Sequence, residues 1–145
     1  MAGLEAMVRE LWDRQLIGRV AHTYARGVDR RDWDLVRSCF ADEAYVEGTS
    51  ARGPVDTYLA DLRPAVERFV TTMHVMANPL IDVDNDRGHV ETYAVAFHWA
   101  AEPAGAPHPA NLTVGVRYHD DLVRRGDGWV ITRRVVSGDW RVPAS

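Results

Sequence analysis

The hydrophobic periodicity of this chain changes for most of its second half near residue 70, and this change restricts the folds that it can adopt. Before residue 70, apolar residues recur mainly every three or four positions, whereas after it they alternate with polar residues at a period of two. Helices followed by a run of strands predict an α+β domain, in which helices cover one face of a sheet. With 145 residues the chain is long enough for one such domain and too short for two ordinary ones. We therefore expect a single domain over residues 1–145.

Three helices are expected in the first part of the chain. The first covers about residues 3–28, as one helix or as two divided at Gly18, and Asp32 is placed to cap a second, short helix. Pro54 opens a third helix, because proline is favoured in the first helical turn. Pro64 lies inside the apolar pattern of this helix, so we expect the helix to end or kink near residue 62.

The second part of the chain predicts a long antiparallel meander. A short strand is also expected between the second and third helices. The expected strands cover about residues 41–49, 70–83, 89–101, 111–124 and 129–142. A sheet bent over helices leaves a cone-shaped cavity, which is a usual place for a small apolar ligand. The broad open face of the sheet needs cover, so a homodimer or homotrimer packed sheet to sheet is expected.

Charge and composition exclude several classes of protein. The net charge is −4 and arginines are scattered among acids, so no nucleic-acid partner is expected. No apolar run approaches the roughly 20 residues that span a bilayer, and the N-terminus lacks a signal-peptide pattern, so no membrane partner and a cytoplasmic location are expected. The single cysteine, Cys39, excludes an internal disulfide. The histidines show no ligand spacing, which predicts no metal site.

An acid/base site is the main functional hypothesis from the residues themselves. Tyr24 lies on the apolar face of the first helix, Asp29 follows where that face ends, and His74 lies on the first long strand. A carboxylate, a phenol and an imidazole that meet inside the fold could transfer protons. The alternative is that Asp29 merely caps the helix or pairs with Arg26 or Arg30, and that His74 is a core histidine.

His98 is a further candidate on the strand expected at residues 89–101. It could supply a second acid, or it could face solvent or an oligomer partner, because the strand pattern leaves the side undecided. Tyr24 also has a structural interpretation, since a phenol on an apolar helix face usually serves packing.

Several short motifs stand in a fixed order along nearly the whole chain. They are residues 24–33, 73–74, 78–83, 115–118, 124, 127–129 and 139–140. In this order they resemble the SnoaL-like branch of the NTF2-like superfamily. The resemblance implies a cone in which about three N-terminal helices pack on a strongly curved mixed or antiparallel sheet and enclose a cavity. Proteins similar to this one include scytalone dehydratase, bile-acid 7α-dehydratase and polyketide cyclases.

The resemblance also implies roles for individual residues. In the dehydratases, an aspartate at the end of the first long helix pairs with a histidine on the strand after the third helix, and these positions are Asp29 and His74 here. The phenol of the bile-acid enzyme falls on Tyr24. Two departures stand out: the second histidine of scytalone dehydratase has no match at residues 114–118, and the further aspartate of the bile-acid enzyme falls near Phe97, next to His98.

Two functions of different classes follow from this resemblance. The first is a lyase or isomerase of dehydratase or cyclase type, which uses neither metal nor organic cofactor and acts on a hydrophobic polycyclic, steroid-like or polyketide-like small molecule. His74 would be the base, Asp29 would orient it, and Tyr24 would donate a hydrogen bond. The second is a non-catalytic small-molecule binding or accessory scaffold protein. The Asp-Arg-Asp arrangement of limonene epoxide hydrolase, which would indicate a hydrolase, is not recognisable in this chain.

Overall fold

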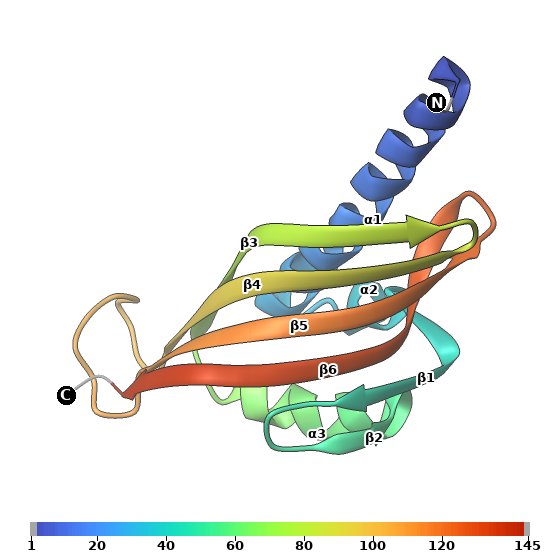
Figure 1. Ribbon diagram of the computed structural model, residues 1–145. Coiled ribbons are helices and arrows are strands. Elements are labelled where there is room, and N and C mark those ends of the chain that lie inside the picture. The colour runs from blue at the N-terminus through green and yellow to red at the C-terminus, as the bar shows by residue number, and fades with distance from the viewer. Residues whose placement is uncertain (1–2, 144–145) are drawn as a thin grey trace.

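The computed structural model describes residues 3–143 and shows helices packed on one face of a six-stranded sheet (Figure 1). The helices are α1 (Leu4–Arg30), α2 (Trp33–Ser38) and α3 (Val55–Glu67). The strands are β1 (Phe40–Glu47), β2 (Arg52–Pro54), β3 (Thr71–Asp84), β4 (Arg87–Trp99), β5 (Leu112–Arg125) and β6 (Gly128–Pro143). The α+β class that the periodicity predicts is confirmed.

The sheet is mixed and open, with the strand order β2-β1-β6-β5-β4-β3. Strands β3 to β6 form the expected antiparallel meander, whereas β1 runs parallel to β6. The register of β3 shifts between Met76 and Pro79. A proline cannot donate a ladder hydrogen bond, so the irregularity falls where the sequence places it.

The core lies between the helices and the inner face of the sheet. Along β4, alternate residues are buried, including Val90, Ala94 and Ala96. From the helices, Ile17, Val28, Val36 and Val55 are almost completely buried against this face, together with Val46 and Ile131 of the sheet. Burial of apolar surface is the main force that holds α1 on the sheet.

The chain turns sharply at the end of α1, and this turn places Asp29. Arg31 follows α1 with φ 60° and ψ 25°, in the left-handed region, and its backbone N–H donates to carbonyls of the last helical turn. Asp32 then accepts a hydrogen bond from the backbone N–H of Leu35 at 3.0 Å, which confirms the predicted cap of the second helix.

The prediction that Pro64 ends the third helix near residue 62 is wrong, because α3 continues to Glu67. A proline inside a helix removes the hydrogen bond to the carbonyl four residues earlier, here that of Ala60. Both residues lie on the exposed side of α3, so water can hydrate the freed carbonyl.

Gly27 allows α1 and α2 to approach closely. A Cβ atom at this position would lie 2.7 Å from Cγ2 of Val36 and 3.0 Å from its backbone nitrogen. We expect Gly27→Ala to lower the free energy of unfolding by about 1–3 kcal/mol, as measured by urea denaturation, because α2 must shift.

Gly18 of the same helix provides the control. A Cβ atom there would meet only Cδ1 of Ile81, at an ordinary 3.8 Å, so Gly18→Ala should be neutral or stabilising by up to about 1 kcal/mol. Equal effects of the two substitutions would contradict the proposed role of Gly27.

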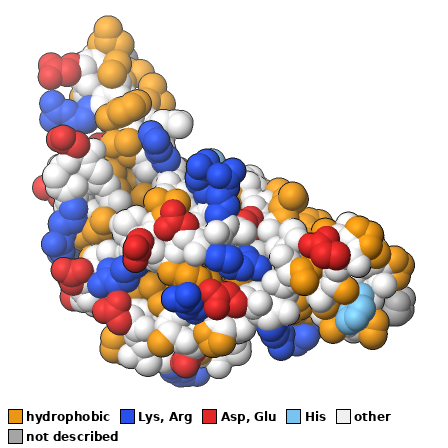
Figure 2. All heavy atoms as spheres, turned by 180° about the vertical axis from the view of Figure 1, so that it is seen from behind, with side chains coloured by type: hydrophobic (Ala, Val, Ile, Leu, Met, Phe, Trp, Pro, Cys, Tyr) orange, Lys and Arg blue, Asp and Glu red, His pale blue; other side chains and the backbone are white. Residues whose placement is uncertain are grey.

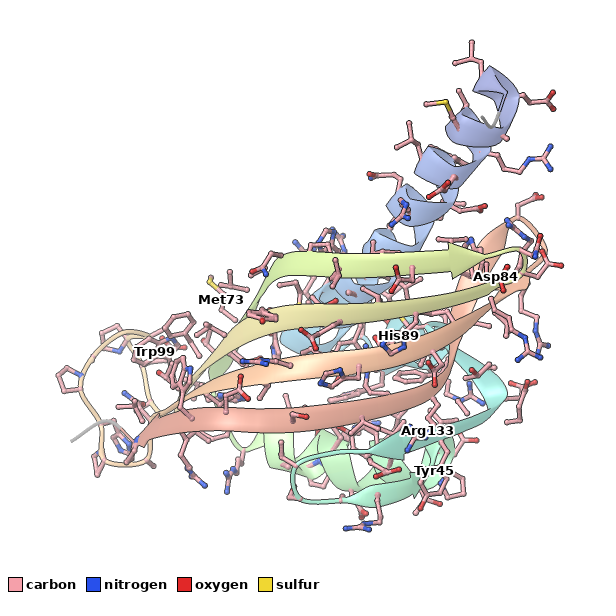
Figure 3. The ribbon with its side chains drawn as sticks, in the orientation of Figure 1. Tyr45, Met73, Asp84, His89, Trp99 and Arg133 are labelled. Carbon is pink, nitrogen blue, oxygen red and sulfur yellow. The ribbon has the colours of Figure 1, made fainter. Side chains whose placement is uncertain are left out.

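The outer face of the sheet carries exposed apolar side chains at the end near residues 100–111, where Figure 3 shows Met73 and Trp99. The most exposed large apolar side chains of this face near that end are Met73, Val75, Trp140 and Val142. The homodimer or homotrimer expected from the sequence would cover these residues, and it stays a prediction.

The face of the molecule on the helix side carries charges of both signs. Figure 2 shows basic and acidic side chains interspersed over the face seen from behind. The first turns of α1 extend beyond the sheet (Figure 1) and expose apolar residues such as Leu4 and Leu11. Within residues 3–143, none of the helices has the length and apolar character needed to cross a membrane.

Candidate active site

The end of α1 and the start of β3 bring Asp29 and His74 together. Oδ1 of Asp29 lies 2.7 Å from Nδ1 of His74, and Oδ2 accepts the backbone N–H of His74 at 2.8 Å. The side chain of His74 is 8% exposed and that of Asp29 is 21% exposed. The carboxylate of Asp29 thus binds both the ring and the backbone of His74, and these two contacts fix the orientation of the imidazole.

A second residue of β3 also binds this carboxylate. Thr72 lies two positions before His74 on the same face of the strand, and its Oγ1 donates to Oδ1 of Asp29 at 3.0 Å. Arg26 and Arg30, which the alternative interpretation offered as partners of Asp29, lie on the exposed side of α1. The bonds of Asp29 are therefore directed to β3 rather than to its own helix.

The protonation state of Asp29 follows from these contacts. Burial raises the pKa of Asp29, but hydrogen bonds from the ring and backbone of His74, the charge of His74 and the bond from Thr72 together hold it below its ordinary value. Near neutral pH the carboxylate is ionised and can only accept hydrogen bonds. Nδ1 of His74 therefore carries the proton of this contact, and Nε2 of a neutral ring is left with a free lone pair.

His98 lies next to His74 across β3 and β4. The rings of His74 and His98 meet edge to face, with their centroids 5.8 Å apart. The ring of Phe69 also packs against that of His98, with the two centroids 4.9 Å apart. Nδ1 of His98 lies 3.1 Å from the carbonyl oxygen of Leu112. A carbonyl oxygen can only accept a hydrogen bond, so the bond forms when Nδ1 is the ring nitrogen that carries the hydrogen. Burial lowers the pKa of His98 and the charge of His74 lowers it further, which favours the neutral ring with a free Nε2.

Tyr24 belongs to a neighbouring aromatic cluster. It is 2% exposed and packs edge to face against Phe40 and Tyr118. The guanidinium of Arg134 lies over its ring, 4.2 Å from the centroid. Burial raises the pKa of Tyr24, although the charge of Arg134 and a hydrogen bond with Tyr58 oppose this rise. Tyr24 therefore keeps its proton, and among residues 3–143 its ring contacts are with this cluster rather than with His74.

Arg134, which lies over these rings, forms a completely buried ion pair with Asp120 that composition and periodicity do not predict. Nε and Nη2 of Arg134 donate to the two carboxylate oxygens of Asp120 at 2.7 and 2.8 Å, and the side chains are 0% and 2% exposed. The signal in the sequence is weak, because a strand with charges on both faces resembles an exposed strand.

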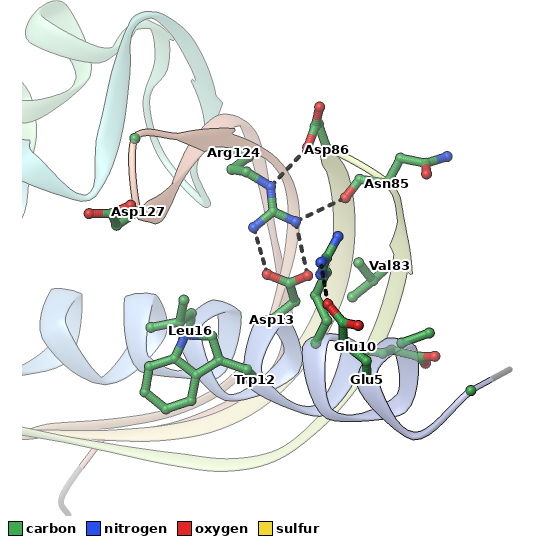
Figure 4. A pocket seen from close by; sticks show the side chains of 14 residues that line it. Glu5, Glu10, Trp12, Asp13, Leu16, Val83, Asn85, Asp86, Arg124 and Asp127 are labelled. Atoms are coloured by element: carbon green, nitrogen blue, oxygen red, sulfur yellow. Dashed lines mark hydrogen bonds and ion pairs between the residues drawn. The ribbon is translucent and has the colours of Figure 1, made fainter.

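Two of the surface pockets formed by residues 3–143 are well defined, and neither of these two is lined by Asp29, His74 or His98. The larger is an open notch of about 1110 Å³ between the start of α1 and the turns after β3 and β5 (Figure 4). It contains the ion pair of Asp13 with Arg124, at 2.7 Å, which Asp86 extends. These charges satisfy one another, so we interpret the notch as structural.

The smaller pocket, of about 300 Å³, lies between α3 and the turn that joins β1 to β2. Tyr58 and Leu62 contribute to its wall. Because Tyr58 also contacts Tyr24, this pocket reaches the aromatic cluster rather than the Asp29–His74 pair. The cone-shaped cavity expected between the helices and the bent sheet is therefore not one of these two pockets.

Metal-ligating side chains are not gathered in the part of the chain that the structure describes. Among residues 3–143, no group of three or more histidine, cysteine, aspartate or glutamate side chains is arranged to hold a metal ion. The single cysteine is buried, and burial raises the pKa of its thiol to about 11, so Cys39 is a poor nucleophile near neutral pH.

Comparisons with known proteins agree with this architecture. Rv2910c of Mycobacterium tuberculosis, an uncharacterized protein, is 27% identical over 132 residues, which cover 88% of this chain and 86% of the relative. A protein of Novosphingobium aromaticivorans provisionally named scytalone dehydratase has 19% identity and a TM-score of 0.81, with 94% and 90% of the two chains covered. The hexachlorocyclohexane dehydrochlorinase LinA-type3 of Novosphingobium barchaimii has 18% identity and a TM-score of 0.76, with 94% and 92% covered.

The similarity to these two structures establishes a shared fold. Membership of a family is established by a match to a family model. The model of the SnoaL-like domain matches residues 9–135, and so includes most of α1, the Asp29–His74 pair and most of the sheet. This chain therefore belongs to the SnoaL-like family.

Proposed function

We propose that this protein is a cofactor-independent lyase or isomerase, of dehydratase or cyclase type, that acts on a hydrophobic polycyclic, steroid-like or polyketide-like small molecule. The observation that carries the proposal is the 2.7 Å contact between Oδ1 of Asp29 and Nδ1 of His74. Among the structures with the same fold, the dehydrochlorinase is named for an elimination, which is one of the reactions that a general base can start.

The proposed reaction needs one proton acceptor. Nε2 of His74 takes a proton from a carbon next to a carbonyl group, and the released electron pair forms a carbon–carbon double bond as the bond to a β-hydroxyl group breaks. The protonated ring then returns the proton to the departing hydroxyl, which leaves as water. Asp29 stabilises the positive ring while it carries this second proton, because the two are in direct contact.

The neighbouring residues fit a substrate of low polarity. His74 faces Ala96 across the strand pair and lies beside His98, on whose ring Phe69 packs. Nε2 of His98 offers an acceptor for a hydroxyl group of the substrate. Tyr24 as a hydrogen-bond donor to the carbonyl oxygen of the substrate remains part of the proposal, although its observed contacts are with the aromatic cluster.

The test is a screen of polycyclic β-hydroxy carbonyl compounds for loss of water, carried out in D₂O and followed by mass spectrometry. We expect His74→Gln to lower the rate by about 10²–10⁴-fold, which is the usual contribution of a positioned base. His89→Gln is the matched control, because His89 also contacts a carboxylate, that of Asp121, but lies half exposed on the outer face. It should leave the rate unchanged.

The same screen distinguishes the second candidate function, a non-catalytic binding or scaffold protein. Compounds that bind the protein without losing water and without exchanging their acidic hydrogen for deuterium would favour that function. Turnover that His74→Gln leaves intact would overturn the assignment of the base.

A further inference from the structure

The residue that follows Asp29 by two positions is unusually constrained. Arg31 adopts a left-handed backbone conformation with φ 60°, which residues other than glycine rarely do. Its guanidinium donates to the carbonyl of Val28 at 2.9 Å and to that of Phe69 at 3.1 Å. One side chain therefore ties the C-terminal end of α1 to the segment that joins α3 to β3.

The same guanidinium also reaches Thr72. Nη1 of Arg31 donates to Oγ1 of Thr72 at 2.8 Å, and Oγ1 of Thr72 lies 3.0 Å from Oδ1 of Asp29. A guanidinium can only donate, so at this contact the threonine oxygen must accept. The single hydroxyl proton of Thr72 is then left to point at Asp29.

We propose that Arg31 and Thr72 are positioning residues for the Asp29–His74 pair, in which Arg31 sets the direction of the Thr72 hydroxyl and Thr72 holds the carboxylate on Nδ1 of His74. The inference rests on the proposed function only for its consequence in catalysis. The relay itself is a property of the folded protein and can be measured without a substrate.

The hydrogen bond from Thr72 to Asp29 can be removed by substitution while the two hydrogen bonds from His74 to Asp29 remain. Oδ2 of Asp29 is held by the backbone N–H of His74, whereas Oδ1 receives both Thr72 and the ring of His74. Without the threonine hydroxyl, the half-buried carboxylate would lose one of its three donors. Burial raises the pKa of Asp29 and the hydrogen bonds lower it, so the loss of one hydrogen bond would raise this pKa.

The experiment is an NMR titration of the Asp29 carboxyl carbon in the full-length protein and its variants. Thr72→Val keeps the shape of a side chain that is only 4% exposed and removes its hydroxyl. We expect the pKa of Asp29 to rise by about one pH unit, as the loss of one hydrogen bond to a charged group predicts. Thr72→Ser should restore the original value.

Thr71→Val is the matched control, because it makes the same chemical change at the neighbouring residue, which points to the opposite face of β3. It should leave the pKa of Asp29 unchanged. A role of Thr72 in packing alone would also leave this pKa unchanged in Thr72→Val. That outcome would overturn the proposal.

The contribution of Arg31 is tested by a double-mutant cycle with Arg31→Met. If Arg31 acts through Thr72, then Arg31→Met raises the pKa of Asp29 in the original protein but adds little in the Thr72→Val background. Equal rises in both backgrounds would show that Arg31 acts by its charge alone, which would contradict the relay. Should Arg31→Met not fold, because it loses its contacts with two segments, the Thr72 series still decides the role of the hydroxyl.

Failure of this proposal and failure of the proposed function give different results. A protein that eliminates no water but shows the predicted titration retains the relay and lacks the reaction. A protein that turns over a substrate but shows no change in Thr72→Val retains the reaction and lacks the relay.

Discussion

Asp29→Asn should lower the rate of the proposed reaction by about 10²–10⁴-fold while leaving the fold intact. The two oxygens of Asp29 both accept hydrogen bonds, one from the backbone N–H of His74 and one from its ring. The backbone N–H of His74 can only donate a hydrogen bond, so the side-chain oxygen of the asparagine must accept it. The NH₂ group of the asparagine must then face Nδ1 of His74. His74 then accepts at Nδ1 and carries its proton on Nε2, where the base is needed.

The measurement is kcat for any substrate found in the screen, together with the tautomer of His74 by ¹⁵N NMR. Asp121→Asn is the matched control, since Asp121 makes a similar contact of 2.8 Å with Nδ1 of His89 on the outer face of the sheet. It should change neither quantity. An Asp29→Asn variant that keeps the proton on Nδ1 and the full rate would refute the orienting role of Asp29.

Asp120→Ala should be the most destabilising single substitution that we predict, with a loss of about 3–5 kcal/mol in the free energy of unfolding. Asp120 binds Arg134 through both oxygens, and the arginine is 0% exposed among aromatic rings. Removal of the carboxylate leaves a buried positive charge with no counterion, and that charge cannot be lost because arginine stays protonated. Urea denaturation followed by circular dichroism measures the effect.

The neighbouring residue of β6 supplies the control for this prediction. Arg133 points to the other side of the sheet and pairs with Glu47 at 2.7 Å, where the side chains are 53% and 37% exposed. Glu47→Ala should therefore cost less than about 1 kcal/mol. The double variant Asp120→Ala with Arg134→Met should recover part of the loss, because it removes the unpaired charge. A small effect of Asp120→Ala alone would show that water reaches Arg134.

Asp29 and His74 could be predicted as site residues from the sequence, because the prediction needs only two local patterns and one family resemblance. The helical pattern ends near Asp29, the strand pattern begins shortly before His74, and the resemblance to SnoaL-like proteins joins the two. The structure brings them into contact and adds Thr72, which lies two residues before His74 and so on the same face of the strand. Nothing in a single sequence shows that this threonine donates to a carboxylate on another element.

The amino-acid sequence by itself determined the α+β class, the order of the helices and of the five longer strands, and the cap at Asp32, because periodicity and capping are local properties of the chain. It did not predict the short strand β2. Only the tertiary structure decided the rest. The left-handed conformation of Arg31, the burial of Arg134 and the pairing of β1 with β6 depend on contacts between distant segments. Periodicity tells which face a residue occupies, but it carries no information on which residue of another element lies opposite.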